Sequence, residues 1–204
     1  MRKEKSMSDI ITYTGIQMNP LQPEPEQIEI RDIAHALSLI CRGGGHVKHF
    51  YSVAQHCLAC AEEARVRGYS VRVQLGSLLH DGSEAYIADV TRPVKQQMPQ
   101  YYEIEGPLQA VIWEKFMTDA DGRPMPPDEE EKQKIFAIDD QMMSLDLYWL
   151  LGDHTVTVSP DILSDRSEAS RDFVPMEQVE QAFLQRFTEL KRQLDAEMQK
   201  EIVL

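Results

Sequence analysis

Apolar residues recur at intervals of three or four in the last part of the chain, which is the period of an α-helix. They are Met176, Val179, Phe183, Phe187, Leu190, Leu194 and Met198. Pro175 precedes this run, and the opposite face carries charges of both signs. We therefore predict one long amphipathic helix that docks on the core or forms a subunit interface, rather than one that lies on a membrane.

The same spacing of apolar residues predicts further helices upstream. These run from Ile30 to the glycines at 43–45, from about Phe50 to Arg67, from Ser70 to the pair His80–Asp81, over 101–118, and through Ile135 to Trp149. Strand-like sequence is confined to a short segment at Thr155–Val158. The predicted fold class is therefore all-α.

The first part of the chain differs, because Pro20, Pro23 and Pro25 predict an extended or turn-rich segment there. A chain of 204 residues with 42% hydrophobic residues can bury one sizeable core. We therefore divide it into an extended lead-in (1–30), a core (31–152), and a loop with a C-terminal helix that packs on the core (153–204).

Charge and composition exclude several classes of partner. The net charge of −13 argues against binding to nucleic-acid polymers or anionic membranes, because both need a surplus of Lys and Arg. No apolar stretch has the length of a membrane span or a signal peptide, so we expect a cytoplasmic protein. Three cysteines suggest reduced thiols, and we interpret Cys57 and Cys60 as packing residues rather than redox or metal-binding groups.

Three ionisable residues, His80, Asp81 and Glu84, follow an apolar helical run closely enough to share one surface. Burying an ionised carboxylate without a partner is very costly, so these groups need a cation, hydrogen bonds or an open cleft. A bound metal ion would meet that need. The alternative is a histidine and an aspartate that merely form hydrogen bonds at a partly exposed helix end.

Two further polar residues interrupt apolar helical patterns. His56 stands in the middle of the helix predicted over 50–67, and Asp139 stands in the helix around Ile135. The neighbouring Asp140 shares a stripe with other apolar residues, so helical periodicity alone does not choose between Asp139 and Asp140.

The order of these residues resembles that of the HD-domain metal-dependent phosphohydrolases. The stretch "HDGSEAYIADVTRPVK" is similar to a motif of the branch that includes the bacterial 5′-deoxynucleotidase, and "DIAHALSLICRGGGH" followed by "FYSVAQHC" resembles small, often phage-associated HD hydrolases. The resemblance spans roughly residues 12–152. It implies that the all-α core is an HD-domain helical bundle.

The resemblance also implies roles for individual residues. The metal ligands would be His56, His80, Asp81 and Asp139. Glu84 and Asp89 would take part in catalysis, and Arg42 would contact phosphate. The alternatives without a catalytic role are that Glu84 lies on a solvated helix face and that Asp89 caps the turn that contains Pro93.

Two other residues are candidates for substrate binding. Lys95 is, like Arg42 and Arg92, a local positive charge that could receive a phosphate in this acidic chain. His46 follows three glycines and could approach the substrate, or it could simply complete the turn.

Two imidazoles and two carboxylates form a mixed nitrogen and oxygen set, which suits Mn²⁺, Co²⁺, Fe²⁺ or Zn²⁺ better than Mg²⁺. We expect hydrolysis of deoxynucleoside 5′-monophosphates, in which metal-bound hydroxide attacks phosphorus. The alternatives are a dNTP triphosphohydrolase and a non-catalytic nucleotide-binding or assembly module with the HD fold. The resemblance also makes a homodimer the expected assembly.

Overall fold

The computed structural model describes residues 9–119 and 121–202, and it has an all-α fold, as predicted. The first eight residues of the predicted lead-in lie outside the described residues. The helices are α1 (Ile30–Leu39), α2 (Val53–Val66), α3 (Val71–Leu79), α4 (Glu84–Ile87), α5 (Arg92–Lys95), α6 (Pro99–Phe116), α7 (Glu129–Trp149) and α8 (Met176–Ile202). Short 3₁₀ turns lie at Pro25–Gln27, Arg42–Gly45 and Glu168–Arg171.

Helix boundaries follow local chemistry that can be read in the sequence. The Ser70 hydroxyl accepts a hydrogen bond from the backbone N–H of Val73 and so caps α3, as predicted. At the start of α7, Asp128 and Glu131 form a reciprocal capping box. Gly68, with a φ of 71°, follows the end of α2 in a conformation that few other residues adopt readily.

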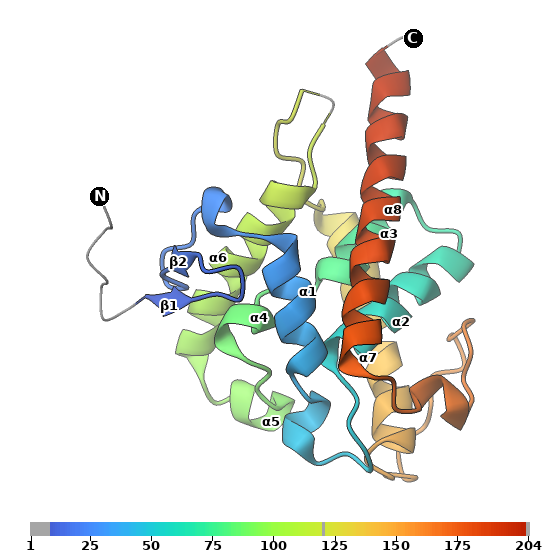
Figure 1. The fold of residues 1–204 in the computed structure, drawn as a ribbon. Helices are drawn as coiled ribbons and strands as arrows, with labels where there is room; N and C mark the ends of the chain where they lie inside the picture. Colours follow the sequence, from blue (N-terminus) through green and yellow to red (C-terminus); the bar gives the residue numbers. More distant parts are fainter. Residues whose placement is uncertain (1–8, 120, 203–204) are drawn as a thin grey trace.

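Helices α2 and α3 pack against each other, and each of them also contacts α7 and α8. In Figure 1, the hairpin and α6 lie on one side of α1, and α8 lies on the other. The main hydrophobic cluster unites α8 with the earlier helices, through buried residues that include Leu37, Leu75, Leu78, Phe183, Leu190 and Leu194. A second cluster joins α2 and α3 to α7, around Val73, Ile135, Ile138 and Met142.

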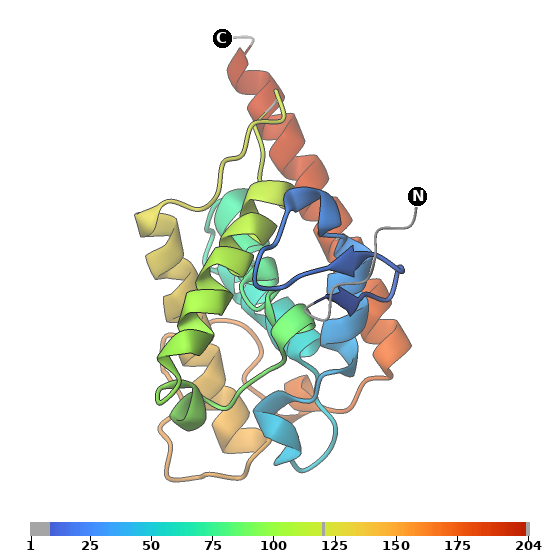
Figure 2. The same ribbon diagram turned by 90° about the vertical axis from the view of Figure 1, so that its left-hand side faces the viewer.

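The predicted lead-in contains a small antiparallel hairpin, which the sequence analysis did not anticipate. Strands β1 (Ile10–Ile11) and β2 (Gln17–Met18) pair in it. Figure 2 shows this hairpin and α6 from the side of the molecule on which they lie. The strand predicted at Thr155–Val158 was wrong, because these residues form an irregular segment between α7 and α8.

The prediction of one helix running through the pair His80–Asp81 was also too simple. Helix α3 ends at Leu79, and residues 80–83 form a turn before Glu84 begins α4. Pro93 lies in the first turn of the short helix α5, where a missing backbone N–H costs little.

The segment between α7 and α8 folds back onto α2. The Glu63 carboxylate is fully buried, and it accepts hydrogen bonds from the backbone N–H groups of Leu163 and Ser164. Arg67 completes its surroundings with a donated bond of 2.6 Å. A buried carboxylate is stable only with such partners, so Glu63 fixes the path of this segment.

No helix among the described residues is both long and apolar enough to cross a membrane. This includes α8, whose residues Val179, Phe183, Leu190 and Leu194 are buried against the other helices. The predicted docking of the C-terminal helix on the core is therefore confirmed for the apolar face of α8.

We expect Phe183→Ala to lower the free energy of unfolding by about 3–5 kcal/mol, because it removes a fully buried ring that joins α8 to the main cluster. Urea denaturation would measure the change. Phe173→Ala is the control, since Phe173 is 51% exposed and its loss should change the stability by less than about 0.5 kcal/mol. Equal effects of the two substitutions would contradict the assigned packing of α8.

Candidate metal centre and adjoining cavity

His80, at the end of α3, presents one ring nitrogen that has no hydrogen-bond partner among the described residues. Its Nδ1–H donates to the backbone carbonyl of Ser77 at 2.7 Å, which leaves Nε2 as the nitrogen with the free lone pair. That Nε2 atom is buried, 3.3 Å from Asp81 Oδ2 and 3.6 Å from Asp139 Oδ1. A buried nitrogen without a partner is unusual and calls for a ligand.

His56, in the middle of α2, is oriented in the same way. Its Nδ1 donates to the Asp146 carboxylate at 2.8 Å, and its Nε2 lies 3.0 Å from Asp139 Oδ1. Carboxylates commonly hold metal-binding histidines in this manner, which fixes the tautomer and directs Nε2 toward the ion. Both imidazoles therefore direct Nε2 toward Asp139.

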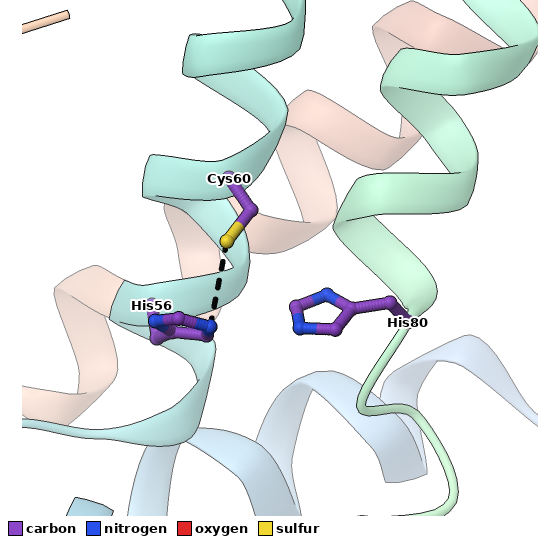
Figure 3. Close-up of side chains that lie close together, drawn as sticks. All are labelled: His56, Cys60 and His80. Carbon is purple, nitrogen blue, oxygen red and sulfur yellow. Dashed lines mark hydrogen bonds between the residues drawn. The ribbon is translucent and has the colours of Figure 1, made fainter. Parts of the chain in front are cut away.

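The spacing of these donor atoms fits one shared ion. Metal–ligand bonds of 2.0–2.2 Å place neighbouring donor atoms about 3–3.5 Å apart. The structure thus brings together the four side chains that the resemblance implies as ligands, His56, His80, Asp81 and Asp139. A buried thiol adjoins them, because Cys60 Sγ lies 3.4 Å from His56 Nε2 (Figure 3). These buried His, Cys and Asp groups could bind a metal ion.

Without a bound ion, protons on the histidines must supply the positive charge that balances the carboxylates of the cluster. Burial by itself would lower the pKa of His80, but the Asp81 and Asp139 carboxylates and the Cys57 thiol together outweigh this effect and raise the pKa well above its usual value. Burial likewise opposes ionisation of Asp81, yet the charge of His80 lowers its pKa to about 2. A divalent cation would supply the same positive charge and displace those protons.

The structure also resolves the choice between the two neighbouring aspartates of α7. Asp139 faces the imidazoles, whereas Asp140 is exposed and accepts a hydrogen bond from Arg92 at 2.7 Å. Only Asp139 is therefore in reach of the other candidate ligands.

Asp146 is a residue of the candidate site that the sequence analysis missed. Besides the bond from His56, its carboxylate accepts one from Arg171 Nε at 2.8 Å, and Arg42 Nη2 lies 3.5 Å away. Burial opposes its charge, but the hydrogen bond from His56 and the two arginines lower its pKa to about 2. Asp146 stands seven residues after Asp139, two helical turns along the same face, and this spacing was a signal in the sequence.

Glu84 begins α4 and is only 3% exposed. Its Oε2 atom is buried and has no hydrogen-bond partner in the part of the chain that the structure describes, and Lys95 Nζ lies 3.9 Å from Oε1. Burial raises the pKa of Glu84 well above its usual value, and the nearby carboxylates of Asp81 and Asp89 raise it further. A carboxyl group in such surroundings is suited to accept or donate a proton.

A cavity of about 560 Å³ adjoins the cluster. The sequence-predicted residues on its wall are Arg42, His46, Asp81, Glu84, Asp89, Lys95 and Asp139. Its apolar lining comes chiefly from Met143, Leu147, Leu150 and Leu151. The volume is that of a typical small-molecule site, and the mixture of apolar wall and converging charged groups is also typical.

Two curated proteins are similar to part of this chain. "Uncharacterized protein YfdR" of Escherichia coli is 39% identical over 110 residues, which cover 54% of this chain and 59% of that protein. "Uncharacterized protein RCAP_rcc00048" of Rhodobacter capsulatus is 37% identical over 108 residues, which cover 50% of this chain and 55% of that protein. The chain thus spans little more than half the length of these relatives, and no family model matches it.

We expect Asp139→Asn to lower the affinity for a divalent cation by at least about tenfold, because it removes the carboxylate that lies within 3.6 Å of both imidazole nitrogens. Titration of the metal-stripped protein with Mn²⁺ or Zn²⁺ by calorimetry would measure this. Asp140→Asn makes the same chemical change one residue away and should leave the affinity unchanged. The reverse result would place the ligand at Asp140.

Proposed function

We propose that this protein is a metal-dependent phosphohydrolase that acts on nucleotides, with deoxynucleoside 5′-monophosphates as its substrates. One observation carries the proposal. His80, whose buried Nε2 has no hydrogen-bond partner within residues 9–119 and 121–202, lies against two carboxylates, Asp81 and Asp139, that also line a cavity of about 560 Å³. The cavity therefore gives a small molecule direct access to the candidate metal centre.

A bound ion would lower the pKa of a water molecule and polarise a phosphate oxygen, which are the two requirements of phosphoester hydrolysis. The nitrogen and oxygen donors support Mn²⁺, Co²⁺, Fe²⁺ or Zn²⁺ over Mg²⁺, which prefers oxygen ligands alone. The remaining catalytic functions fall to groups on the cavity wall.

Arg42 is the group best placed to bind the phosphate. Its guanidinium lies 3.5 Å from both Asp81 and Asp146, distances that are long for charge-assisted hydrogen bonds. Several N–H donors therefore remain for an anion in the cavity. Attraction to these carboxylates outweighs burial and raises the pKa of Arg42 further above its usual value, so the positive charge persists.

Glu84 is the candidate proton acceptor. It lines the cavity beside Asp81, and its raised pKa suits a group that takes a proton from the attacking water near neutral pH. Asp89 lies on the same wall and could orient the water or the leaving group. His46 is exposed at the cavity and could contact the outer part of a substrate.

The balance of charge in the cavity supports a monophosphate. Carboxylates on the wall outnumber the Arg and Lys side chains. Apart from Arg42, these basic groups already have partners: Arg92 bonds to Asp140, and Lys95 bonds to Glu105 at 2.5 Å. The additional negative charges of a triphosphate would meet few free donors. The apolar residues of the lining suit a nucleoside.

The test is release of phosphate from nucleoside and deoxynucleoside monophosphates by the metal-stripped protein after addition of Mn²⁺, Co²⁺, Zn²⁺ or Mg²⁺. We expect Glu84→Gln to lower kcat by about 10²–10⁴-fold without loss of metal, because it removes only a proton acceptor. His80→Ala should lose both metal and activity. Glu103→Gln, on the exposed surface of α6, is the matched control and should change neither.

Other outcomes would identify the alternatives. Release of triphosphate from dNTPs would indicate a triphosphohydrolase. Nucleotide binding without turnover with any of the metals would indicate a binding module, and the catalytic role of Glu84 would then be wrong.

We also propose that the protein forms a homodimer, which rests on the resemblance described above. The buried face of α8 is already covered by the chain's own core, so this face is not free to form the interface. Size-exclusion chromatography with light scattering should give twice the chain mass of 23.4 kDa, and a monomer at micromolar concentration would contradict the proposal.

A further inference from the structure

Cys60 is a buried thiol that the proposed hydrolysis does not use. It lies one helical turn after His56 on α2, and its Sγ points toward the His56 ring (Figure 3). Most buried free cysteines act only as small apolar residues. Here the surroundings are not apolar, because Sγ lies 3.4 Å from His56 Nε2.

Three donor atoms converge at this point. A ring nitrogen of His56, a ring nitrogen of His80 and the Sγ atom of Cys60 all lie within 4.8 Å of one another. Nε2 of His80 is buried and has no hydrogen-bond partner among the described residues. The unpartnered nitrogen is an observation independent of the cysteine, and it points to a missing ligand.

Cys60 lies on the interior side of the imidazoles. Asp81 and Asp139 line the cavity, whereas Cys60 is 1% exposed and takes no part in that lining. The histidines therefore stand between two sets of ligands, with hard carboxylate oxygens toward the cavity and a soft sulfur toward the core.

The separation of the donor atoms fits a tetrahedral ion. Bonds of about 2.3 Å to sulfur and about 2.0 Å to nitrogen place the two atoms about 3.5 Å apart around tetrahedral Zn²⁺. The observed distance from Sγ to Nε2 is 3.4 Å. Thiolate and imidazole together favour Zn²⁺ and similar thiophilic ions, whereas Mn²⁺ and Mg²⁺ favour oxygen.

We propose that Cys60, His56 and His80 form an inner position for thiophilic divalent ions such as Zn²⁺, distinct from the position that Asp81 and Asp139 share with the same histidines. Coordination forms a metal–sulfur bond, and the thiol proton passes to solvent. Because each Nε2 has one lone pair, the two positions exclude each other. An ion at the inner position is withdrawn from the cavity, so the identity of the metal determines where it sits.

This inference rests on the metal centre of the proposed function, and it is independent of the substrate. The probe is Co²⁺, whose bond to a thiolate gives a sulfur-to-cobalt charge-transfer absorption in the near ultraviolet. Bound cobalt is measured separately by elemental analysis of the full-length protein. We expect the native protein to show the absorption, Cys60→Ser to lose it, and Cys41→Ser to keep it, because Cys41 lies outside the cluster.

Metal competition provides a second readout. In Cys60→Ser, the affinity for Zn²⁺ should fall by at least about tenfold, the smallest loss usual when a group that supports a metal site is removed. The affinity for Mn²⁺ should be unchanged, since Mn²⁺ uses the carboxylates. Cys60→Ala should behave like Cys60→Ser, and thermal melting of both variants would check that they fold.

Several results would overturn the inference. Cobalt bound to the native protein without the absorption would leave the metal centre intact and exclude the inner position. Cys57 also lies near His80. Loss of the absorption in Cys57→Ser but not in Cys60→Ser would show that Cys57, and not Cys60, is the sulfur ligand. Failure to bind cobalt at all would remove both proposals, whereas the absorption without phosphate release would refute only the hydrolytic one.

Discussion

The hydrogen bond from His56 to Asp146 is the interaction on which the rest of the centre depends. It joins α2 to α7 in a region closed to solvent, where an ionised carboxylate is stable only beside positive or hydrogen-bonding groups. Arg171 and Arg42 supply the remaining positive charge, from two short turns that are distant in sequence. Removing any one of them would leave the buried Asp146 carboxylate with less compensating charge. The geometry of the imidazoles, the arginines and the cavity is therefore set as one unit.

Much of the fold could be predicted from the sequence because helical spacing and local capping act over a few residues. Ser70 caps α3, and the apolar face of α8 is buried as its spacing indicates. The turn after Leu79 was missed because its cause is tertiary. A Cβ atom at Gly82 would lie 3.0 Å from the Leu79 carbonyl oxygen and 3.3 Å from Ile112 on α6, so the close approach of these segments favours glycine. No periodicity in the sequence reveals that contact.

The candidate site was only partly visible in the sequence. Asp139 interrupts an apolar pattern and attracts notice, but the packing of α7 against α2 and α3 was needed to distinguish it from Asp140. Arg171 gave no signal, because it lies in an irregular segment whose path depends on contacts with distant residues. Cys60 was interpreted as a packing residue, and it is indeed buried. Its contact with His56 follows from the helical spacing of four residues between them.

The anchoring of the segment after α7 to Glu63 has a consequence for how the chain can be divided. Leu163 and Ser164 bond to Glu63 on α2, and Arg171 bonds to Asp146 on α7. The segment 153–175 is therefore attached to the core at two places before α8 begins. A fragment that stops at residue 152 would expose both carboxylates as well as the apolar surface that α8 covers. The unit for expression or domain grafting is therefore the core together with its C-terminal extension, because the extension contributes Arg171 to the surroundings of Asp146.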